Sequence, residues 1–213
     1  MMKKIILLFT LFSLNLVHSQ NDIRAEKLLN SVSEKIDSSE TFKINFTYTL
    51  ENLIENINQD SDGSIVIKDD NYLLEFMGIK QLCDSKKVYS IVPENEEIII
   101  SNIDEDESET IKPSKLLKFY REGYLILWDK KELILEKEIQ FVKLIPINSN
   151  SDIDYLQLGI DISNNDIVKL IEIGKNKTKT ILTVNQLQYD IEIDLNFFVF
   201  SEEDYPDYYI ENL

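Results

Sequence analysis

The sequence feature that most constrains the fold is an alternation of apolar and polar side chains near the start of the chain. Between residues 41 and 50 every second residue is apolar, and most of these are aromatic: Phe42, Ile44, Phe46, Tyr48 and Leu50. Successive side chains of a β-strand point to opposite faces of a sheet, so this period of two predicts a half-buried strand with an aromatic inner face. A chain with such a strand needs a sheet that has one face covered.

Short apolar runs separated by polar turns continue along the chain and predict many further strands. We expect them at Ser64 to Lys68, Tyr72 to Phe76, Ile79 to Cys83, Lys87 to Val92, Glu97 to Asn102, Gly123 to Trp128, Glu132 to Lys137, Ile139 to Ile145, Asp154 to Asp161, Ile167 to Ile173, Lys177 to Leu187 and Phe197 to Phe200. Consecutive short strands are typical of an antiparallel meander. We therefore predict a mainly β (α+β) fold, an incomplete antiparallel β-barrel or strongly curved sheet, rather than two domains.

Two segments instead have the spacing of an amphipathic helix. Residues Ile23 to Ile36 place apolar or small side chains three and four positions apart, with charges on the other side. A second helix is expected from Pro113, whose missing N–H would be unpaired in a first helical turn anyway. In this helix Leu116, Leu117 and Tyr120 fall on one face. The periodicity leaves open whether it packs on the sheet or caps a cavity.

The second helix closes a stretch, Leu82 to Tyr120, in which three local signals follow one another. Two apolar runs flank a polar turn and are expected to pair as a hairpin. The acidic segment Asp104 to Glu109 comes next, and we interpret it as a solvated loop. That loop would bring the helix back across one end of the sheet.

The dipeptide Asp62-Gly63 predicts a hairpin turn. The surrounding residues also approximate a twelve-residue calcium loop, with oxygen-bearing side chains at Asn58, Asp60 and Asp62 before the glycine. An EF-hand needs helices on both sides and prefers a final glutamate, whereas here strands are predicted on both sides and Asp69 is last. We therefore interpret the segment as an acidic turn and not as a metal site.

The first twenty residues have the three-part pattern of a secretory signal peptide. Two lysines precede an uncharged run from Ile5 to Val17, and a site of small residues follows. The apolar run is shorter than the roughly 20 residues that a membrane span needs. We expect cleavage after Ser19, which makes residues 1–19 the signal peptide and 20–213 a single soluble, exported domain.

Charge and residue usage exclude several classes of function. The chain has 22 Lys and Arg against 39 Asp and Glu, a formal net charge of −17, which disfavours nucleic acid as a partner. Cys83, the single cysteine, cannot form an internal disulfide, and we interpret it as a buried strand residue. His18, the single histidine, leaves with the signal peptide, so Ser-His and Cys-His catalysis and histidine-ligated metal are excluded. Because a Gly-rich phosphate loop, G-x-S-x-G and CxxC are also missing, we predict no enzyme, no catalytic residue, no metal and no cofactor.

Several short motifs follow one another along the mature chain. They are Asp84-Ser85-Lys86-Lys87-Val88-Tyr89, Pro93-Glu94 before Glu97-Ile98, Pro113-Ser114-Lys115-Leu116-Leu117, Leu144-Ile145-Pro146, and Phe198-Val199-Phe200 with Tyr205-Pro206. In this collinear order they resemble the outer-membrane lipoprotein carrier (LolA) family, in the form met in Bacteroidetes-type bacteria.

The resemblance implies an incomplete antiparallel barrel with helices lying over an apolar cavity, which accepts the acyl chains of a lipoprotein. It also implies a monomeric periplasmic carrier with three kinds of partner: acylated lipoproteins, an inner-membrane lipoprotein-releasing transporter and an outer-membrane acceptor. The side chains that we then expect in the cavity or its lid are Phe46, Tyr48, Ile67, Leu74, Phe76, Tyr89, Leu116, Leu117, Tyr120, Tyr124 and Trp128.

The sequence departs from the family pattern where Lys68-Asp69-Asp70 replaces an Arg-Pro whose arginine ties the lid shut. Control of the lid by that arginine is therefore not expected here, and apolar contacts of the lid helix are expected to hold it instead. Ser85 also replaces a turn glycine, and Tyr89 replaces a frequent tryptophan.

Two alternatives stay open from the sequence. One is a module of the same fold that binds another lipid or senses lipoproteins, since fold does not fix function. The other is an acidic interaction module whose interior is filled by its own side chains.

Overall fold

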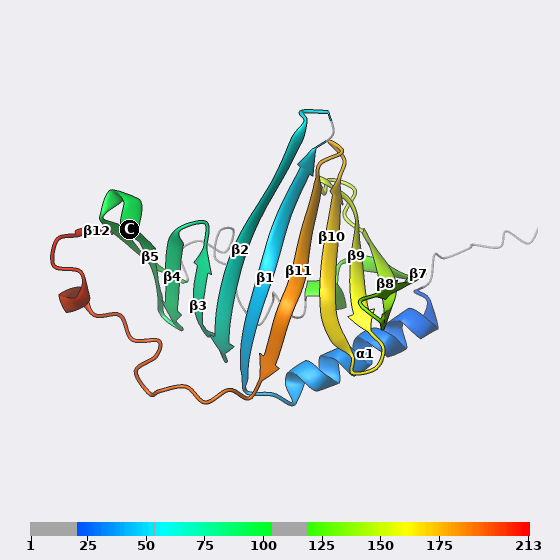
Figure 1. Ribbon diagram of the computed structural model, residues 1–213, viewed down its shortest axis with the longest axis horizontal. Helices are drawn as coiled ribbons and strands as arrows, with labels where there is room; N and C mark the ends of the chain where they lie inside the picture. Colours follow the sequence, from blue (N-terminus) through cyan, green and yellow to red (C-terminus); the bar gives the residue numbers. More distant parts are fainter. Residues whose placement is uncertain (1–20, 53, 104–118) are drawn as a thin grey trace, which may run out of the picture.

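The computed structural model describes residues 21–52, 54–103 and 119–213, and this part of the chain is mainly β. One α-helix, α1 (Ile23–Asp37), precedes a single sheet of twelve strands in these residues (Figure 1). The strands are β1 (Thr41–Asn52), β2 (Ile57–Lys68), β3 (Asn71–Phe76), β4 (Ile79–Asp84), β5 (Lys87–Val92), β6 (Glu97–Asn102), β7 (Tyr124–Ile134), β8 (Lys137–Pro146), β9 (Ile153–Asp161), β10 (Asp166–Gly174), β11 (Lys179–Tyr189) and β12 (Tyr209–Asn212). Three short 3-10 helices lie between strands: η1 (Pro93–Asn95), η2 (Phe119–Arg121) and η3 (Glu202–Asp204). The predicted mainly β fold is confirmed.

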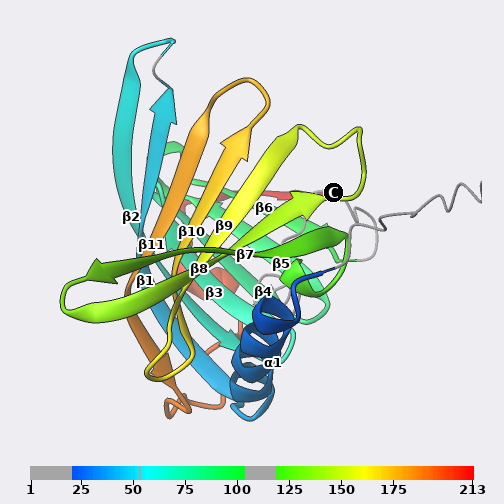
Figure 2. The same cartoon turned by 90° about the vertical axis from the view of Figure 1, so that its right-hand side faces the viewer.

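The sheet consists of two meanders joined side by side. Its strand order is β12-β6-β5-β4-β3-β2-β1-β11-β10-β9-β8-β7, so β1 pairs with both β2 and β11. Neighbouring strands are antiparallel except for β12, which adds to β6 in parallel. The sheet curves strongly, as Figure 2 shows, but it does not close into a barrel, because β7 and β12 stand at opposite ends of the order.

Helix α1 forms where the sequence predicts it, because its apolar residues share one face. The side chain of Asp22 caps the first turn, where its Oδ1 accepts a hydrogen bond from the Arg24 N–H at 2.9 Å. The helix ends at Asp37, and the N–H of Ser38 still donates to the Glu34 carbonyl at 3.0 Å. The buried apolar side chains follow one another at spacings of four, three and four: Ala25, Leu29, Val32 and Ile36. They join side chains of the sheet in the main hydrophobic core.

The predicted turn at Asp62-Gly63 is wrong. β1 and β2 pair without interruption from Thr41 opposite Lys68 to Asn52 opposite Ile57, so the chain turns between Asn52 and Ile57. Gly63 lies opposite Phe46 in the middle of this ladder, and a Cβ at Gly63 would stand 2.5 Å from Phe46 Cζ. The glycine therefore makes room for an aromatic ring and does not make a turn.

The pairing of β1 with β2 also bears on residues 58–69, which approximate a calcium loop in sequence and which we interpret from the sequence as an acidic turn. Residues 58–68 lie in the extended backbone of β2, and Asp69, with a φ of +52°, lies in the turn that follows. Among the residues that the structure describes, no three His, Cys, Asp or Glu side chains come together as a metal site would require. Asp60 and Asp62 are therefore strand residues.

Two details of the predicted strand pattern are also wrong. The break expected after Trp128 is only a bulge between Trp128 and Lys131, and β7 continues to Ile134. The turn comes at Leu135 and Glu136, whose φ angles are +47° and +65°. The strand expected at residues 197–200 is also missing, and β12 is the last strand instead.

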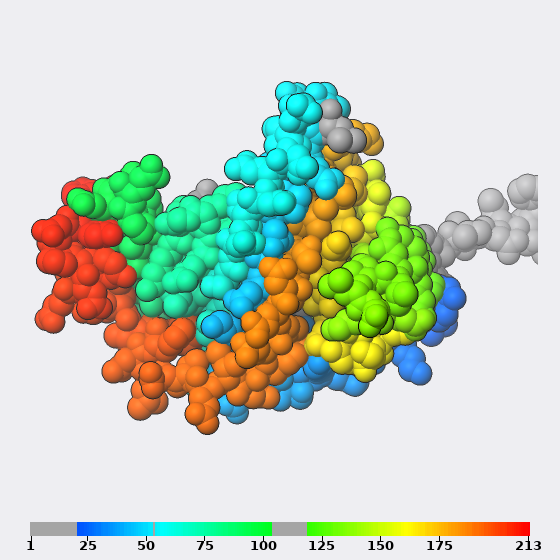
Figure 3. Space-filling view, in the orientation of Figure 1, coloured from blue at the N-terminus to red at the C-terminus, as the bar shows by residue number. Residues whose placement is uncertain are grey.

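The segment after β11 runs back along the molecule to reach β6. Figure 3 shows it passing along the lower edge of that view before its end packs beside β5 and β6. There the Phe200 ring stacks on Tyr89, with 4.4 Å between ring centroids, and Ile98 is fully buried in the small core that results.

The stretch Leu82 to Tyr120 is described in part. β5 and β6 form the expected hairpin around η1, where Glu96 takes a left-handed conformation with φ +52°. The acidic segment, most of the helix predicted from Pro113, and the predicted signal peptide lie outside the described residues. No helix in the described part is long and apolar enough to cross a membrane.

Candidate functional site

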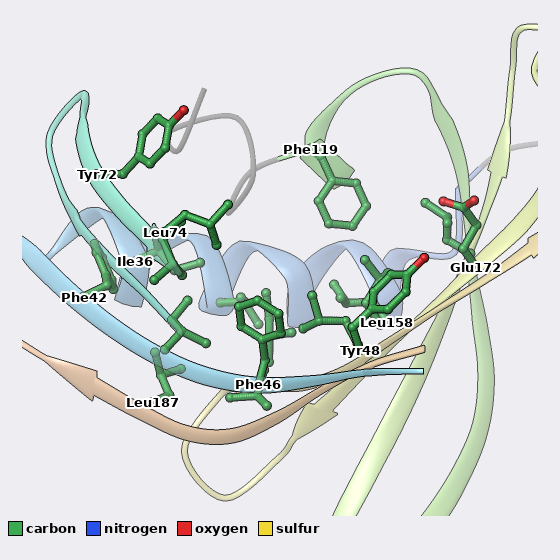
Figure 4. A pocket seen from close by; sticks show the side chains of 18 of the residues that line it. Ile36, Phe42, Phe46, Tyr48, Tyr72, Leu74, Phe119, Leu158, Glu172 and Leu187 are labelled. Carbon is green, nitrogen blue, oxygen red and sulfur yellow. The ribbon is translucent and has the colours of Figure 1, made fainter. Parts of the chain in front are cut away.

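A cavity of about 410 Å³ is lined by α1 and the inner face of the sheet (Figure 4). Val32 and Ile36 of α1 form part of its wall, and strands β1, β2, β3, β7, β9, β10 and β11 contribute nearly all the rest. The size falls within the roughly 300–1,000 Å³ that is typical of small-molecule sites. The lining is almost wholly apolar, so the cavity suits an apolar ligand.

The alternation of strand side chains explains why these residues face inward. On β1 the cavity takes Phe42, Ile44, Phe46 and Tyr48, which are the even-numbered residues singled out by the period of two. On β11, Val184 lines the cavity, whereas the next residue, Asn185, is exposed. The cavity is thus built from the inner faces of neighbouring strands.

Aromatic rings form one wall of the cavity. Phe76 lies between Phe46 and Tyr48, with ring centroids 5.6 Å and 5.5 Å away. Phe42 meets Tyr189 edge to face at 5.5 Å. Such tilted and edge-to-face pairs are favourable arrangements of aromatic rings, so this wall is held together by contacts between its own members.

Two of the tyrosines that line the cavity direct their hydroxyls to partners. The Tyr72 hydroxyl donates to Gln81 Oε1 at 2.7 Å, and the Tyr189 hydroxyl donates to Asp166 Oδ1 at 2.5 Å. Burial, and for Tyr189 also the nearby Asp166, raises the pKa of both phenols above the ordinary value. Both therefore stay neutral at physiological pH, which keeps this part of the wall uncharged.

Glu172 is the one charged side chain among the described residues that line the cavity. It lies on β10, two residues after Leu170, so both side chains share the inner face. Figure 4 places Glu172 at one end of the cavity and Tyr72 at the other. The cavity therefore has an apolar body and one acidic end.

The structure brings together five of the side chains expected from the sequence. Phe46, Tyr48, Leu74, Phe76 and Tyr124 all line the cavity. Their shared signal is the alternation within predicted strands. That they bind acyl chains stays a prediction.

Four others lie elsewhere. Ile67 is buried in the core, and Tyr120, only 1% exposed, shares a hydrogen bond of 3.0 Å with Ser33 of α1. Tyr89 packs under the C-terminal segment, and the Trp128 ring lies 5.1 Å from the guanidinium carbon of Arg24. The remaining two, Leu116 and Leu117, lie outside the described residues.

The sequence does not reveal that α1 and β9 to β11 contribute to the cavity. The periodicity predicts Val32 and Ile36 on a helix stripe, and Leu170, Leu182 and Val184 in strands, but it places none of them at a site. The period of each segment identifies an apolar face. It does not say whether that face meets other side chains or a cavity.

Comparisons with known proteins identify the fold. No family model and no curated protein sequence matches the chain. Among solved structures, an uncharacterized conserved protein from Thermus thermophilus matches with a TM-score of 0.60 at 10% identity, over 89% of this chain and 99% of that one. LprF from Mycobacterium bovis matches with a TM-score of 0.51 at 10% identity, over 83% and 97%. The chain shares its fold with these two proteins.

A further solved structure is similar at a lower level. It is a LolA superfamily protein from Nitrosomonas europaea, with a TM-score of 0.42 at 11% identity, over 83% of this chain and 97% of that one.

Proposed function

We propose that this chain is a periplasmic carrier that binds the acyl chains of lipoproteins in its cavity and shuttles lipoproteins from the inner to the outer membrane. The observation that carries the proposal is the cavity of about 410 Å³ with an almost wholly apolar lining. The collinear motifs that resemble the LolA family support the same conclusion. In this proposal residues 1–19 are removed on export, and residues 20–213 form the carrier.

The volume of the cavity suits an acyl chain. A methylene group takes about as much space as a water molecule, roughly 30 Å³, so 410 Å³ holds on the order of a dozen methylenes. Burying a methylene is worth about 0.8 kcal/mol, so a dozen stabilise the bound chain by roughly 10 kcal/mol. Exposing the same chain to water costs the same free energy. A lipoprotein without a carrier would therefore hardly leave its membrane.

The character of the wall suits release as well as binding. Apolar and aromatic side chains attract an acyl chain without directional contacts, so they do not fix one chain length or one position. The proposal assigns no catalysis, and the protein acts as a monomer. Its partners are the acylated cargo, a lipoprotein-releasing transporter in the inner membrane and an acceptor in the outer membrane.

Site-specific crosslinking in the periplasm tests the proposal. A photoreactive residue replaces Val184, which lines the cavity, and in a matched variant it replaces Gln188, which is exposed on the same strand. We expect acylated lipoproteins to be captured at position 184 and not at position 188. Recovery of no acylated protein from position 184, with lipoproteins correctly sorted after depletion of this chain, would contradict the proposal. Capture of free lipid alone would instead indicate a module that binds another lipid.

A further inference from the structure

The tyrosine hydroxyls of the cavity fall into two groups. Those of Tyr72 and Tyr189 have hydrogen-bond partners on side chains that do not line the cavity. Those of Tyr48 and Tyr124 form no hydrogen bond with any residue in the described part of the chain. Figure 4 shows Tyr48 at the same end of the cavity as Glu172. Hydrogen-bonding capacity is thus left open at this end.

Glu172 adds a negative charge to the same end. It pairs with Thr180 of β11 and Leu156 of β9, so its neighbours across the ladder carry no positive charge. No lysine or arginine of the described residues forms an ion pair with it. After burial, the negative charge of Glu172 is the second cause that raises the pKa of the Tyr124 phenol, which places the two groups in the same local field.

The unpaired charge of Glu172 favours some head groups of an apolar ligand over others. Glu172 is half-buried and has no ion pair with a described residue, so it is an unpaired negative charge at an otherwise apolar wall. An ammonium group supplies both the opposite charge and N–H donors, and it is also attracted to the faces of aromatic rings. A carboxylate on the ligand would be repelled by Glu172.

We propose that the cavity takes an amphiphile in which an ammonium group is joined to the acyl chain. The chain packs on the apolar wall around Phe46 and Leu74, and Glu172 binds the ammonium group beside the phenols of Tyr48 and Tyr124. This inference rests on the proposed function and narrows its cargo. The free α-amino group of a diacylated peptide and the amine of a lipid headgroup both offer this chemistry.

Titration calorimetry with two ligands of equal chain length tests the inference. The delipidated protein is titrated with dodecylamine, which is a cation at neutral pH, and with dodecanol, which is uncharged. We expect the protein to bind dodecylamine at least tenfold more tightly. In the Glu172→Gln variant the two affinities should become equal, through weaker binding of dodecylamine alone. The control Glu75→Gln removes one charge from an exposed position on β3 and should keep the preference.

Further titrations distinguish the two sources of the ammonium group. One pair compares a diacylated cysteinyl peptide that has a free α-amino group with its N-acetylated form. The other compares short-chain phosphatidylethanolamine with phosphatidylglycerol. If the source is the peptide, N-acetylation should weaken binding; if it is a lipid headgroup, phosphatidylglycerol should bind more weakly than phosphatidylethanolamine. In either case Glu172→Gln should make the two affinities of that pair equal.

The outcomes separate this inference from the function on which it rests. Equal binding of dodecylamine and dodecanol by the unmodified protein would overturn the inference and leave acyl-chain binding in place. A preference that survives Glu172→Gln would also overturn it. Binding of neither ligand would overturn the proposed function, and the inference with it.

Discussion

At the scale of single residues, Gly63 explains how the aromatic wall is packed. The Phe46 ring lies over the backbone of β2 at the point where Phe46 and Gly63 pair, and Phe76 closes in from β3. An added Cβ would stand 2.5 Å from Phe46 Cζ and 3.0 Å from Phe76 Cδ2. The sequence motif Asp62-Gly63 has a strong turn signature, but a contact between strands decides the role of the glycine. Local pattern cannot reveal such a contact.

We expect Gly63→Ala to lower the free energy of unfolding by about 1–3 kcal/mol, because the methyl group overpacks the site and displaces the Phe46 ring. Chemical denaturation measures the change. Combined with Phe46→Leu, the alanine should cost less than it does alone, since the two side chains compete for one space. An unchanged denaturation midpoint for Gly63→Ala would contradict the close contact.

At the scale of elements, the C-terminal segment is a separate unit attached to one end of the sheet. β12 extends the sheet beyond β6, and Ile210 packs in a small core with Ile91, Ile98 and Ile100. None of these residues lines the cavity. The strand sits where the sequence predicts none, because the backbone of β6 supplies its pairing from more than a hundred residues away. By contrast, α1 was predicted nearly to the residue, since its apolar stripe is a local signal.

We expect Ile210→Asp to detach β12 from β6 without changing the affinity of the cavity for an acyl ligand. The charge would be forced into the apolar contact with Ile98, whereas the neighbouring Tyr209 is 66% exposed and Tyr209→Asp should be tolerated. Limited proteolysis checks this: cleavage after residue 190 should become faster in Ile210→Asp only, with equal affinity for an acyl ligand in both variants. Equal cleavage of the two variants would refute the assignment.

At the scale of the whole molecule, buried phenols link stability to alkaline pH. Burial raises the pKa of Tyr72, Tyr120 and Tyr189 in the folded protein. In the unfolded chain the pKa of a tyrosine is about 10. The unfolded chain therefore loses these protons first. The resulting stabilisation is fully present below about pH 10 and is lost as the pH rises through the raised folded values.

We accordingly expect the free energy of unfolding to fall steadily above about pH 10, and to fall less steeply in Tyr72→Phe. Urea denaturation at a series of pH values measures both slopes. Tyr209→Phe serves as the control, since Tyr209 is 66% exposed. Identical slopes for the unmodified protein and Tyr72→Phe would contradict a buried phenol at that position.

The sequence predicts which strand side chains face inward better than it predicts which elements enclose the cavity. Alternation on β1 and β3 correctly places Phe46, Tyr48 and Leu74 on an inner face, because period two is a property of each strand alone. The contribution of α1, the acidic end at Glu172 and the burial of Tyr89 depend on how elements far apart in sequence meet. These features follow from curvature and strand order, which no local pattern encodes.

Binding of an uncharged fluorescent acyl-chain probe to the delipidated protein tests the central claim most directly. We expect saturable binding by the unmodified protein and affinity weaker by about tenfold or more in Val184→Glu, which places a charge in the cavity. Affinity should be unchanged in Gln188→Glu, on the exposed face of the same strand. Circular dichroism verifies that both variants keep the fold. Absence of saturable binding by the unmodified protein, or equal affinity of a folded Val184→Glu, would contradict an acyl-chain site in this cavity.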